Sequence, residues 1–441
     1  MTSWIVLGAV VALVALLYAL WDRVEHRRVA AAAKEQADVA SMGEVVPASL
    51  HPMIDPGRCI QSGACIRGCV EKQVLGLVGG RAHLINPMAC IGHGTCESTC
   101  PVGAIQLVYG SKTRGVELPR LDPGFQTNQP GIYIVGELSG MGLIRNAVKQ
   151  GVEAAASITR GPPGQPPRRG VGGAFDALVI GAGPAGIAAT LGLMAAKLNV
   201  QMIEREAFGG TITHYPRAKV VMTGALDLPL YGRVKQKTMS KEELVAVWQD
   251  ILQTIRPPLI TEELVERLER DAHGMWVVHT TRGSHRAASV VLALGMRGAP
   301  AKLGVPGEER PKVAYRLLEP EPFLGKHVLV VGGGNAAVES ALALSDFGKC
   351  ASVTISYRRD KFARCRAEYR RRIDAAIAAP KVRFLPNSSV KQVADQAVSL
   401  ATPAGPIELP NDALIVQIGG TPPTQILKSF GVELVTKYGE R

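Results

Sequence analysis

The sequence predicts an α/β protein in which two nested βαβ units follow a small α+β module and one apolar N-terminal helix. Three observations predict this fold class: two glycine-rich turns framed by apolar strands, a repeat of cysteines at a fixed offset, and an uncharged run near the N-terminus. Because the chain has 441 residues, it exceeds one ordinary hydrophobic core, and we expect two or three domains.

The N-terminal run predicts a transmembrane helix over residues 1–22. Residues 4–21 read WIVLGAVVALVALLYALW, which is uncharged and about one bilayer span long. The following DRVEHRR is basic, so the positive-inside rule predicts a single-pass membrane protein with its catalytic part in the cytoplasm. A cleaved signal peptide is the alternative, but the basic n-region is missing. Residues 23–50 are Ala-rich and polar and predict a helical or flexible stalk.

The charge balance narrows the classes of partner. The formal net charge is +12, and the most basic stretch is YRRDKFARCRAEYRRR at 357–372. Such a stretch suits a phosphate-bearing cofactor, an acidic partner or an anionic membrane, or it is a solvated helix face. We expect no nucleic-acid partner. Six of the eight cysteines lie in one short segment without the pattern of a secreted disulfide scaffold, which indicates a reducing compartment.

That segment, within a module predicted at 51–110, is a duplicated iron–sulfur motif of the ferredoxin type. The copies read CIQSGACIRGC and CIGHGTCESTCP, beginning at Cys59 and Cys90. The standard run is C-x2-C-x2-C-x3-C-P, whose fourth cysteine binds the other cluster. This crossed rule predicts two ligand sets: Cys59, Cys65 and Cys100 for cluster one, and Cys90, Cys96 and Cys69 for cluster two.

Each copy lacks its second cysteine, where Ser62 and His93 stand instead. Either side chain could bind the fourth iron, since histidine binds cluster iron in Rieske centres. Water could bind that iron, or the iron could be absent. The sequence therefore predicts two iron–sulfur clusters, [4Fe-4S] or [3Fe-4S]. The alternatives are a degenerate empty module and a zinc site.

The first glycine-rich turn predicts a Rossmann-like dinucleotide-binding unit. It lies in FDALVIGAGPAGIAATLGLMAAKLNVQMIERE at 175–206. Gly181, Gly183 and Gly186 form GxGxxG, which suits a tight turn, close approach of pyrophosphate and helix–strand packing. Glu204 ends the second strand, where an acid binds ribose hydroxyls.

A second Rossmann-like unit occupies 326–360, with Gly332, Gly334 and Ala337 in a GxGxxA turn. Arginines replace the acid after its second strand, and guanidinium groups suit a 2′-phosphate. The sequence therefore predicts FAD in the first unit, over 174–297, and NADPH in the second, over 298–420, followed by a C-terminal tail at 421–441. The residues predicted to bind the 2′-phosphate are Arg358, Arg359 and Arg364.

Residues 171–441 resemble the thioredoxin reductase superfamily of flavoproteins. GGTITHYPRAKVVMTGALDLPLYG at 209–232 and LLEPEPFLGKHVLVVGGGNAAVE at 317–339 are similar to its bacillithiol-disulfide-reductase-like branch. The resemblance implies FAD and a nicotinamide as cofactors, a homodimer, and disulfide chemistry. However, the segment before the second turn, VAYRLLEPEPFLGK, contains no catalytic CxxC, and the remaining Cys350 and Cys365 do not form one.

The order of the segments also departs from this family. Its members end with a segment like T-x-x-P-G-I-Y-x-x-G-D that returns to the flavin domain. Here a similar segment, LDPGFQTNQPGIYIVGELSGMGLIRNAVKQGVEAAASI, stands at 121–158, ahead of the first Rossmann strand. The resemblance therefore implies a circular permutation. A closing segment of the FAD domain at 111–160 is joined by a Pro/Gly-rich linker at 161–173.

In that segment the residues that match the family's flavin-binding pair are Gly136 and Glu137, with Glu in place of Asp. The alternative is that 121–158 is an appendage of the cysteine module.

Together these features predict a membrane-anchored, NADPH-dependent FAD and iron–sulfur oxidoreductase, with no side chain needed as a catalytic acid or base. Electrons would pass to or from a one-electron partner such as ferredoxin, a cytochrome or a quinone. One alternative is a thioredoxin or low-molecular-weight disulfide reductase, which would need a catalytic cysteine. The other is an iron–sulfur redox sensor.

Overall fold

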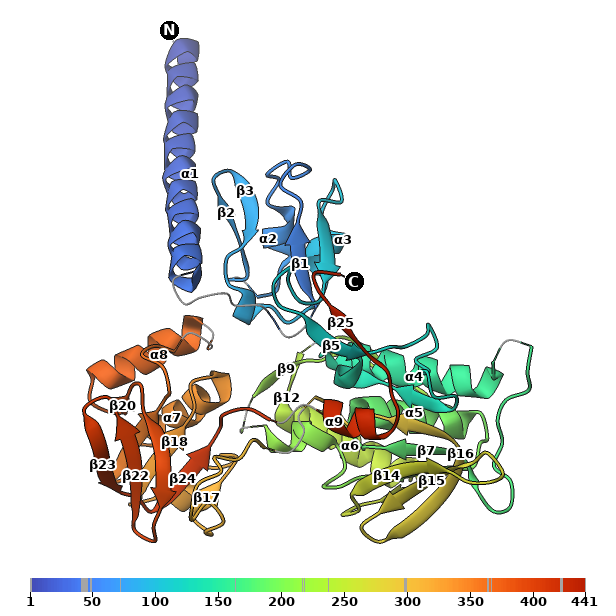
Figure 1. The fold of residues 1–441 in the computed structure, drawn as a ribbon. Coiled ribbons are helices and arrows are strands. Elements are labelled where there is room, and N and C mark those ends of the chain that lie inside the picture. The colour runs from blue at the N-terminus through green and yellow to red at the C-terminus, as the bar shows by residue number, and fades with distance from the viewer. Residues whose placement is uncertain are drawn as a thin grey trace. The chain divides into compact units, whose positions relative to one another are not determined.

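The computed structural model describes residues 2–40, 47, 50–71, 73–162, 164–215, 217, 219–236, 238–296, 300–362, 365, 367–420 and 423–440 (Figure 1). The chain divides into two compact units. One consists of Met1–Val116 with Lys437–Arg441, and the other of Glu117–Thr436.

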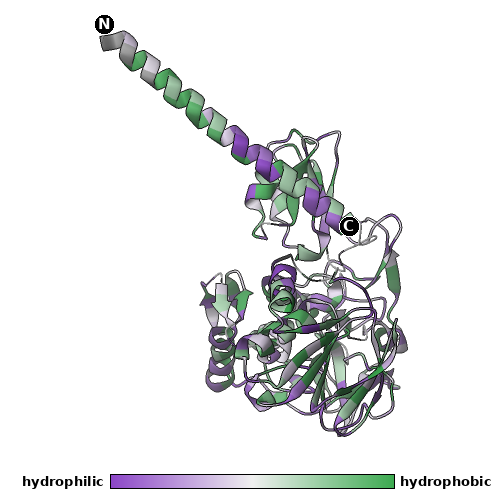
Figure 2. Cartoon of the chain, turned by 90° about the vertical axis from the view of Figure 1, so that its left-hand side faces the viewer, coloured by the Kyte–Doolittle hydropathy of each residue, from purple (hydrophilic) through white to green (hydrophobic). Residues whose placement is uncertain are grey.

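The first unit begins with α1 (Thr2–Ala40), one continuous helix. Hydrophobic residues dominate its N-terminal half and hydrophilic residues follow (Figure 2). Large apolar side chains between Trp4 and Trp21 are exposed, so this half is not a core helix of the described chain. Among the described residues, α1 alone is long and apolar enough to cross a membrane, a criterion that signal sequences also meet.

The second half of α1 packs on the cysteine module. Ala32 is buried against Gly76, where an added Cβ would lie only 2.7 Å from the Ala32 Cβ. Polar contacts flank this point: Glu35 Oε1 accepts a hydrogen bond from Asn86 at 3.0 Å, and Gln36 lies 3.4 Å from His83. The predicted stalk is therefore helical as far as Ala40 and is docked on the module over its last turns. The rest of the predicted stalk contains the undescribed residues 41–46 and 48–49.

The cysteine module is built from two similar halves. Its elements are β1 (His51–Ile54), α2 (Ala64–Gly68), β2 (Leu75–Val78), β3 (Arg81–Leu84), η1 (Pro87–Ala89), α3 (Thr95–Ser98) and β4 (Ile105–Val108). β1 pairs with β4, and β2 pairs with β3, both antiparallel. Gly63 and Gly94 precede α2 and α3 with φ of 64° and 83°, a left-handed conformation that glycine adopts without steric cost.

The C-terminal segment returns to this module. β25 (Leu434–Lys437) pairs with β5 (Val116–Pro119), and the Gly439 N–H then donates to Tyr109 O at 2.8 Å (Figure 1). Earlier in the predicted tail, α9 (Thr424–Ser429) and the residues after it bury Leu427 and Phe430 in a core of the second unit. The predicted tail is therefore structured over most of its described length.

The second unit contains a seven-stranded sheet in the order β13-β8-β7-β16-β15-β14, with β6 also paired to β16. The strands are β6 (Ile132–Ile134), β7 (Phe175–Ile180), β8 (Val200–Ile203), β13 (Leu259–Ile260), β14 (Val265–Arg270), β15 (Trp276–Thr280) and β16 (Gly283–Leu292). The pairs β13-β8, β8-β7, β7-β16 and β16-β6 are parallel, as βαβ connections require.

The segment predicted to close the flavin domain is part of this sheet. Ile132 of β6 pairs with Val290 of β16, and Ile132 is fully buried. α4 (Ile144–Arg160) packs on α5 (Pro184–Ala195) so closely that a Cβ on Gly151 would lie 2.3 Å from a backbone oxygen of α5. These contacts rule out the alternative that the segment is an appendage of the cysteine module.

A second parallel sheet has the order β17-β24-β18-β19-β20. Its elements are β17 (Val313–Ala314), η4 (Glu321–Phe323), β18 (His327–Val331), α7 (Asn335–Phe347), β19 (Ser352–Ser356), α8 (Ala367–Ala378), β20 (Arg383–Leu385) and β24 (Ala413–Val416). An antiparallel sheet of β21 (Ser389–Val393), β22 (Ala397–Thr402) and β23 (Gly405–Pro410) packs against it. This domain is inserted between β16 and α9, so the nested order predicted from the sequence is observed.

Short elements complete the first sheet's domain. They are η2 (Gly136–Ser139), η3 (Gly210–His214), β9 (Val220–Met222), β10 (Leu226–Leu228), β11 (Gly232–Val234), β12 (Thr238–Ser240) and α6 (Lys241–Thr254). α6 begins with a capping box, in which Ser240 and Glu243 each bind the other's backbone N–H. It buries Trp248 against residues of α5, which supports the wall of the site described next.

Candidate functional site

A cavity of about 660 Å³ opens at the carboxyl ends of the parallel strands of the first sheet. Its walls come from the first glycine-rich turn, the ends of β8 and β16, η2, η3, and residues around Arg316 and Gln425. All of these belong to the second unit. The volume is typical of a cofactor site, and its place at the strand ends is typical of open α/β sheets.

The glycines of the first turn form a cradle beside the cavity. Gly181 has φ of 103°, and a Cβ on Gly186 would lie 1.8 Å from the Gly181 oxygen. Gly183, at the N-cap of α5, lines the cavity, and a Cβ there would meet no protein atom within 4 Å. The space in front of Gly183 is therefore free for a ligand, and the N-terminus of α5 suits an anionic group such as a pyrophosphate.

Glu204 lines the cavity at the end of β8, as the sequence predicted. Its carboxylate also holds two turns in place, because it accepts hydrogen bonds from Ala182 N–H at 2.7 Å and Glu206 N–H at 2.8 Å. The Glu204 side chain is buried, and its two hydrogen bonds hold the backbone at Ala182 and Glu206 in place. These two stretches of backbone border the place where a ribose would lie.

Gly136 and Glu137 bring the segment at 121–158, which the sequence predicts to be permuted, to the same cavity. Gly136 has φ of 81°, and a Cβ there would lie 3.0 Å from the Cβ of Ala185 in α5. Its N–H donates to Oε1 of Gln150, a residue of α4 that is 2% exposed. The buried Nε2 of Gln150 has no partner within the described ranges. The sequence did not point to Gln150, because it belongs to no recognised motif.

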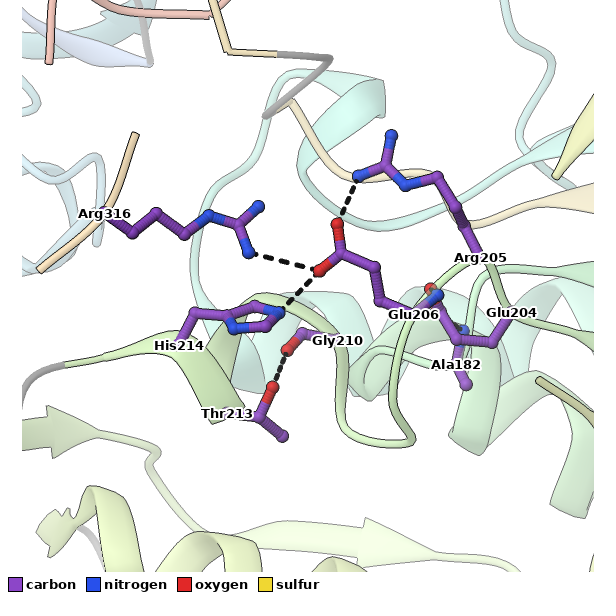
Figure 3. A network of polar contacts seen from close by, with 8 residues as sticks. All are labelled: Ala182, Glu204, Arg205, Glu206, Gly210, Thr213, His214 and Arg316. Carbon is purple, nitrogen blue, oxygen red and sulfur yellow. Dashed lines mark hydrogen bonds and ion pairs between the residues drawn. The ribbon is translucent and has the colours of Figure 1, made fainter. Parts of the chain in front are cut away.

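Glu206 is the centre of a polar network on the cavity wall (Figure 3). Its carboxylate lies 2.6 Å from His214 Nε2, 3.1 Å from Arg316 Nη1 and 2.9 Å from Arg205 Nη2. Partial burial by itself would raise the pKa of Glu206. The hydrogen bond and charge of Arg316, with the charges of Arg205 and His214, lower that pKa to about 2.

This network was not predicted, because its members lie on separate loops without a motif. Arg316 follows β17, the first strand of the inserted domain, whereas His214 ends η3. The network therefore joins the two halves of the second unit at the rim of the cavity.

The second glycine-rich turn has the same construction. Gly332 has φ of 143°, and a Cβ there would lie 2.2 Å from Gln417 O, whereas a Cβ on Gly334 would meet nothing within 4 Å. Ala337 is fully buried against the turn. Gln417 follows β24, and its buried Oε1 has no hydrogen-bond partner among the residues described.

The arginines predicted for the 2′-phosphate follow β19. Arg358 is exposed and Arg359 is half-buried. Arg364 lies outside the described residues. Gly334 at the N-cap of α7 and the cations beyond the neighbouring strand fit a phosphorylated dinucleotide.

The six module cysteines form the two crossed groups that the repeat predicts. Burial raises the pKa of Cys65, and the neighbouring Cys100 and Cys59 raise it further. These three, together with Ser62, line one small cavity.

The second group consists of Cys69, Cys90 and Cys96. Burial, with Cys90 and Cys69 next to it, raises the pKa of Cys96 to about 12. Burial and the nearby Cys69 and Glu71 raise the pKa of Cys90. His93 lies against this group, since its Nε2 accepts the Val70 N–H at 3.3 Å.

This donor set fits a cluster better than a single ion. Within the described ranges, no three Cys, His, Asp or Glu side chains converge as a single-ion site would require. A cluster instead binds thiolates on different irons, so its ligands stay apart. The raised pKa values of Cys65, Cys90 and Cys96 favour the protonated thiol, so binding of iron at these residues would release protons.

The two remaining cysteines do not line the cavity. Cys365 is 2% exposed and donates to Phe362 O at 3.3 Å, and burial raises its pKa to about 11. Burial also raises the pKa of Cys350. Neither residue lines the 660 Å³ cavity, nor does any module cysteine.

Comparison with known proteins agrees with this architecture. Residues 178–439 match the family described as pyridine nucleotide-disulphide oxidoreductase, and residues 51–101 match the 4Fe-4S dicluster domain. Ferredoxin–NADP reductase of Ignicoccus hospitalis is 29% identical over 266 residues, covering 59% of this chain and 82% of that protein. Ferredoxin–NADP reductase of Sulfurisphaera tokodaii is 33% identical over 195 residues, covering 43% of this chain and 55% of its relative, about half of that relative's length.

Solved structures show the same fold. Bacillithiol disulfide reductase of Staphylococcus aureus superimposes with a TM-score of 0.51 at 22% identity, covering 59% of this chain and 80% of that structure. The resemblance stated from the sequence is thus confirmed. The chain belongs to the pyridine nucleotide-disulphide oxidoreductase family, as an NAD(P)H-dependent flavoprotein oxidoreductase that carries a 4Fe-4S dicluster domain.

Proposed function

We propose that the protein passes electrons between NADPH and a one-electron partner through FAD and two iron–sulfur clusters. The observation that carries this proposal is the distribution of thiols. The cavity that fits FAD is lined by no cysteine, whereas six cysteines form two crossed groups in the fused module. A disulfide reductase needs a thiol at the flavin, and an electron-transfer flavoprotein does not.

In this proposal FAD occupies the 660 Å³ cavity. Gly183 leaves room for the pyrophosphate at the N-terminus of α5, Gly181 and Gly186 shape the turn, and Glu204 takes the ribose hydroxyls. Gly136 and Glu137 close the other side. Bound FAD supplies the conversion between a two-electron hydride and single electrons, and the side chains bind and orient it.

NADPH binds at the second turn, through Gly332, Gly334 and Ala337, with the 2′-phosphate held by Arg358, Arg359 and Arg364. Each hydride carries two electrons, so one NADPH serves two turnovers of a one-electron partner and leaves NADP⁺ and a proton. The reverse direction, from reduced clusters to NADP⁺, balances equally.

Cluster one is bound by Cys59, Cys65 and Cys100. Cluster two is bound by Cys69, Cys90 and Cys96. Ser62 and His93 stand at the fourth positions, and the nuclearity, [4Fe-4S] or [3Fe-4S], follows from whether those positions hold iron. The named relatives include several ferredoxin–NADP reductases, so a ferredoxin-type protein is the first partner to test, with a cytochrome or quinone as the others.

The exposed apolar half of α1 supports anchoring to a membrane as a single-pass protein, with the remainder in the cytoplasm. The resemblance to the thioredoxin reductase superfamily, whose members are usually homodimers, supports a homodimer.

A disulfide reductase remains the second candidate, since a bacilliredoxin reductase of Bacillus subtilis is 24% identical over 269 residues. Alanine at both Cys350 and Cys365 separates the two. Loss of NADPH-dependent electron transfer in this double variant would contradict the proposal, because neither thiol has a part in it. A redox sensor would instead show negligible NADPH turnover with every acceptor.

The decisive experiment is anaerobic titration of the purified, cluster-loaded protein with NADPH, followed by visible and EPR spectra, with dithionite as the control reductant. The expected result is bleaching of the flavin followed by cluster signals. If the flavin bleaches while cluster signals appear only with dithionite, the proposed electron route is wrong.

A further inference from the structure

Three arginine side chains gather around the first cysteine loop, and all three are exposed. Each donates to a backbone carbonyl of the loops that carry the cluster-one cysteines: Arg58 to Val102 O at 3.0 Å, Arg67 to Ser62 O at 2.9 Å, and Arg81 to Pro56 O. Ser62 and Val102 line the small cavity formed by the cluster-one cysteines. The three guanidinium groups are therefore tethered to the rim of the cluster-one site.

An exposed apolar side chain lies within this rim. Ile60 directly follows Cys59 and is 61% exposed, although it also lines the cluster-one cavity. The turn of the β2-β3 hairpin approaches the same loop, since a Cβ on Gly80 would lie 3.2 Å from Gln61 Oε1. We call the surface of Arg58, Ile60, Arg67 and Arg81 the cluster-one rim. Asp55 is an exposed acid near this rim, and its Oδ1 accepts the Gly57 N–H.

The surroundings of cluster two differ in charge. An acid, Glu71, stands two residues after Cys69 and its backbone O lies 3.1 Å from Cys69 Sγ, and His93 contacts the backbone beside Cys69. Lys72 lies outside the described residues. The cationic rim described above therefore belongs to cluster one.

A basic rim around an apolar centre suits one class of partner. Opposite charge on the partner raises the rate of encounter, and arginine is enriched in protein interfaces. Ile60 supplies a contact that excludes water directly beside a cluster ligand, Cys59, so a docked carrier would approach the cluster closely. Transient redox encounters need only small interfaces, of less than about 1,200 Å² in total.

We propose that an acidic one-electron carrier protein docks on the cluster-one rim and exchanges electrons with cluster one. This proposal rests on the proposed function, because it requires a cluster in that site. In each encounter one electron leaves the reduced cluster and reduces the oxidised metal centre of the carrier. No bond forms or breaks.

The test uses the full chain in detergent with its clusters reconstituted. Clusters are reduced with dithionite, excess reductant is removed anaerobically, and the protein is mixed with an oxidised plant-type [2Fe-2S] ferredoxin, whose surface is acidic. Mitochondrial cytochrome c, which is basic, serves as the probe of opposite charge. An equilibrium titration with the oxidised ferredoxin gives a second readout that needs no electron transfer.

Replacing the three rim arginines (Arg58→Gln, Arg67→Gln, Arg81→Gln) should lower the second-order rate with ferredoxin by roughly tenfold or more at low salt and flatten its salt dependence. The rate with cytochrome c should stay the same or rise. The Arg→Lys triple variant should retain most of the rate. A matched loss of three charges elsewhere, Lys235→Gln, Arg383→Gln and Lys391→Gln, should have little effect.

EPR spectra of the reduced triple variants check that cluster one is still assembled. An unchanged ferredoxin rate and salt dependence in the Arg→Gln triple variant would overturn the proposal. So would binding of the native rim to phosphatidylserine vesicles but not to ferredoxin. A third outcome is that NADPH fails to reduce the clusters although the ferredoxin rate of the dithionite-reduced protein still depends on the three rim arginines. That result would contradict the proposed function and support the docking surface.

Discussion

The carboxylate of Glu206 and the guanidinium of Arg316 lie 3.1 Å apart on the wall of the flavin-type cavity. Glu206 follows β8 of the first sheet, and Arg316 follows β17 at the entrance to the inserted domain. One ion pair therefore connects the two dinucleotide-binding halves beside the place where FAD is proposed to bind.

This pair makes stability depend on pH. The folded-state pKa of Glu206 is about 2, below the ordinary 4.5, so the stabilisation is present above pH 4.5 and is lost as the pH falls toward 2. The Glu206→Gln variant should lose about 1 kcal/mol, or roughly 2–4 °C in unfolding midpoint, because the site is partly exposed. Between about pH 2 and 4.5, the free energy of unfolding of this variant should also depend less on pH than that of the native protein. Thermal unfolding followed by flavin fluorescence measures both.

Glu309→Gln is the matched control for that variant, because Glu309 is exposed and takes part in none of the three ion pairs of Glu206. Equal midpoints for the two variants at pH 7 would mean that the network contributes nothing to stability.

Two glycines of the first turn should respond differently to alanine. A Cβ on Gly186 would lie 1.8 Å from the Gly181 oxygen, so Gly186→Ala should destabilise the fold itself by about 1–3 kcal/mol. A Cβ on Gly183 would meet no protein atom, so Gly183→Ala should fold normally but bind FAD roughly tenfold or more weakly, because the methyl group occupies ligand space.

Circular dichroism of the apo-proteins and FAD titration separate these effects. Native FAD affinity in Gly183→Ala would contradict the assignment of this cavity to the cofactor.

The crossed ligand sets can be tested by single cysteine variants. Cys59→Ala and Cys100→Ala should remove the same cluster signals, although the two residues lie at opposite ends of the motif. Cys69→Ala and Cys90→Ala should both remove the other set. EPR of dithionite-reduced protein and iron content provide the measurement. If instead Cys100→Ala matched Cys96→Ala, each cluster would be bound by one copy of the repeat.

The arginines after β19 should set the choice of nicotinamide cofactor. The double variant Arg358→Gln, Arg359→Gln should raise KM for NADPH by roughly 10–100-fold and change KM for NADH little, because only NADPH carries the 2′-phosphate. Steady-state kinetics with ferricyanide as acceptor tests this without involving a protein partner. Arg383→Gln is the control, and a parallel rise of both KM values would show that the arginines act on the fold or on groups common to both cofactors.

Local motifs allowed much of the site to be predicted. The two glycine-rich turns, the acid after β8 and the cysteine repeat have fixed spacings, because each serves one turn or loop of the chain. Gln150, His214, Arg316 and Gln417 belong to no motif. Folding brings His214 and Arg316 to the wall of the cavity, whereas Gln150 and Gln417 stand out only because each has a buried side-chain atom without a partner in the described chain.

The cysteine repeat shows which properties of a site follow from the sequence and which depend on the tertiary structure. The sequence by itself determined the number of thiols and the place of Ser62 and His93 where each copy lacks a cysteine, and the spacing along the chain predicts the crossed ligand sets. Only the tertiary structure decided which charges surround each loop. The carbonyls that bind Arg58 and Arg81 are distant from them in sequence.

The same holds for the segment at 121–158, which the sequence predicts to be permuted. Its likeness to a closing segment could be recognised from residues, but its place beside β16 depends on contacts between distant residues, such as the hydrogen bond from the Val290 N–H to Gly131 O at 2.7 Å. Spacing along a sequence determines contacts within a turn or helix, whereas contacts between distant segments form only when burial of apolar side chains brings those segments together.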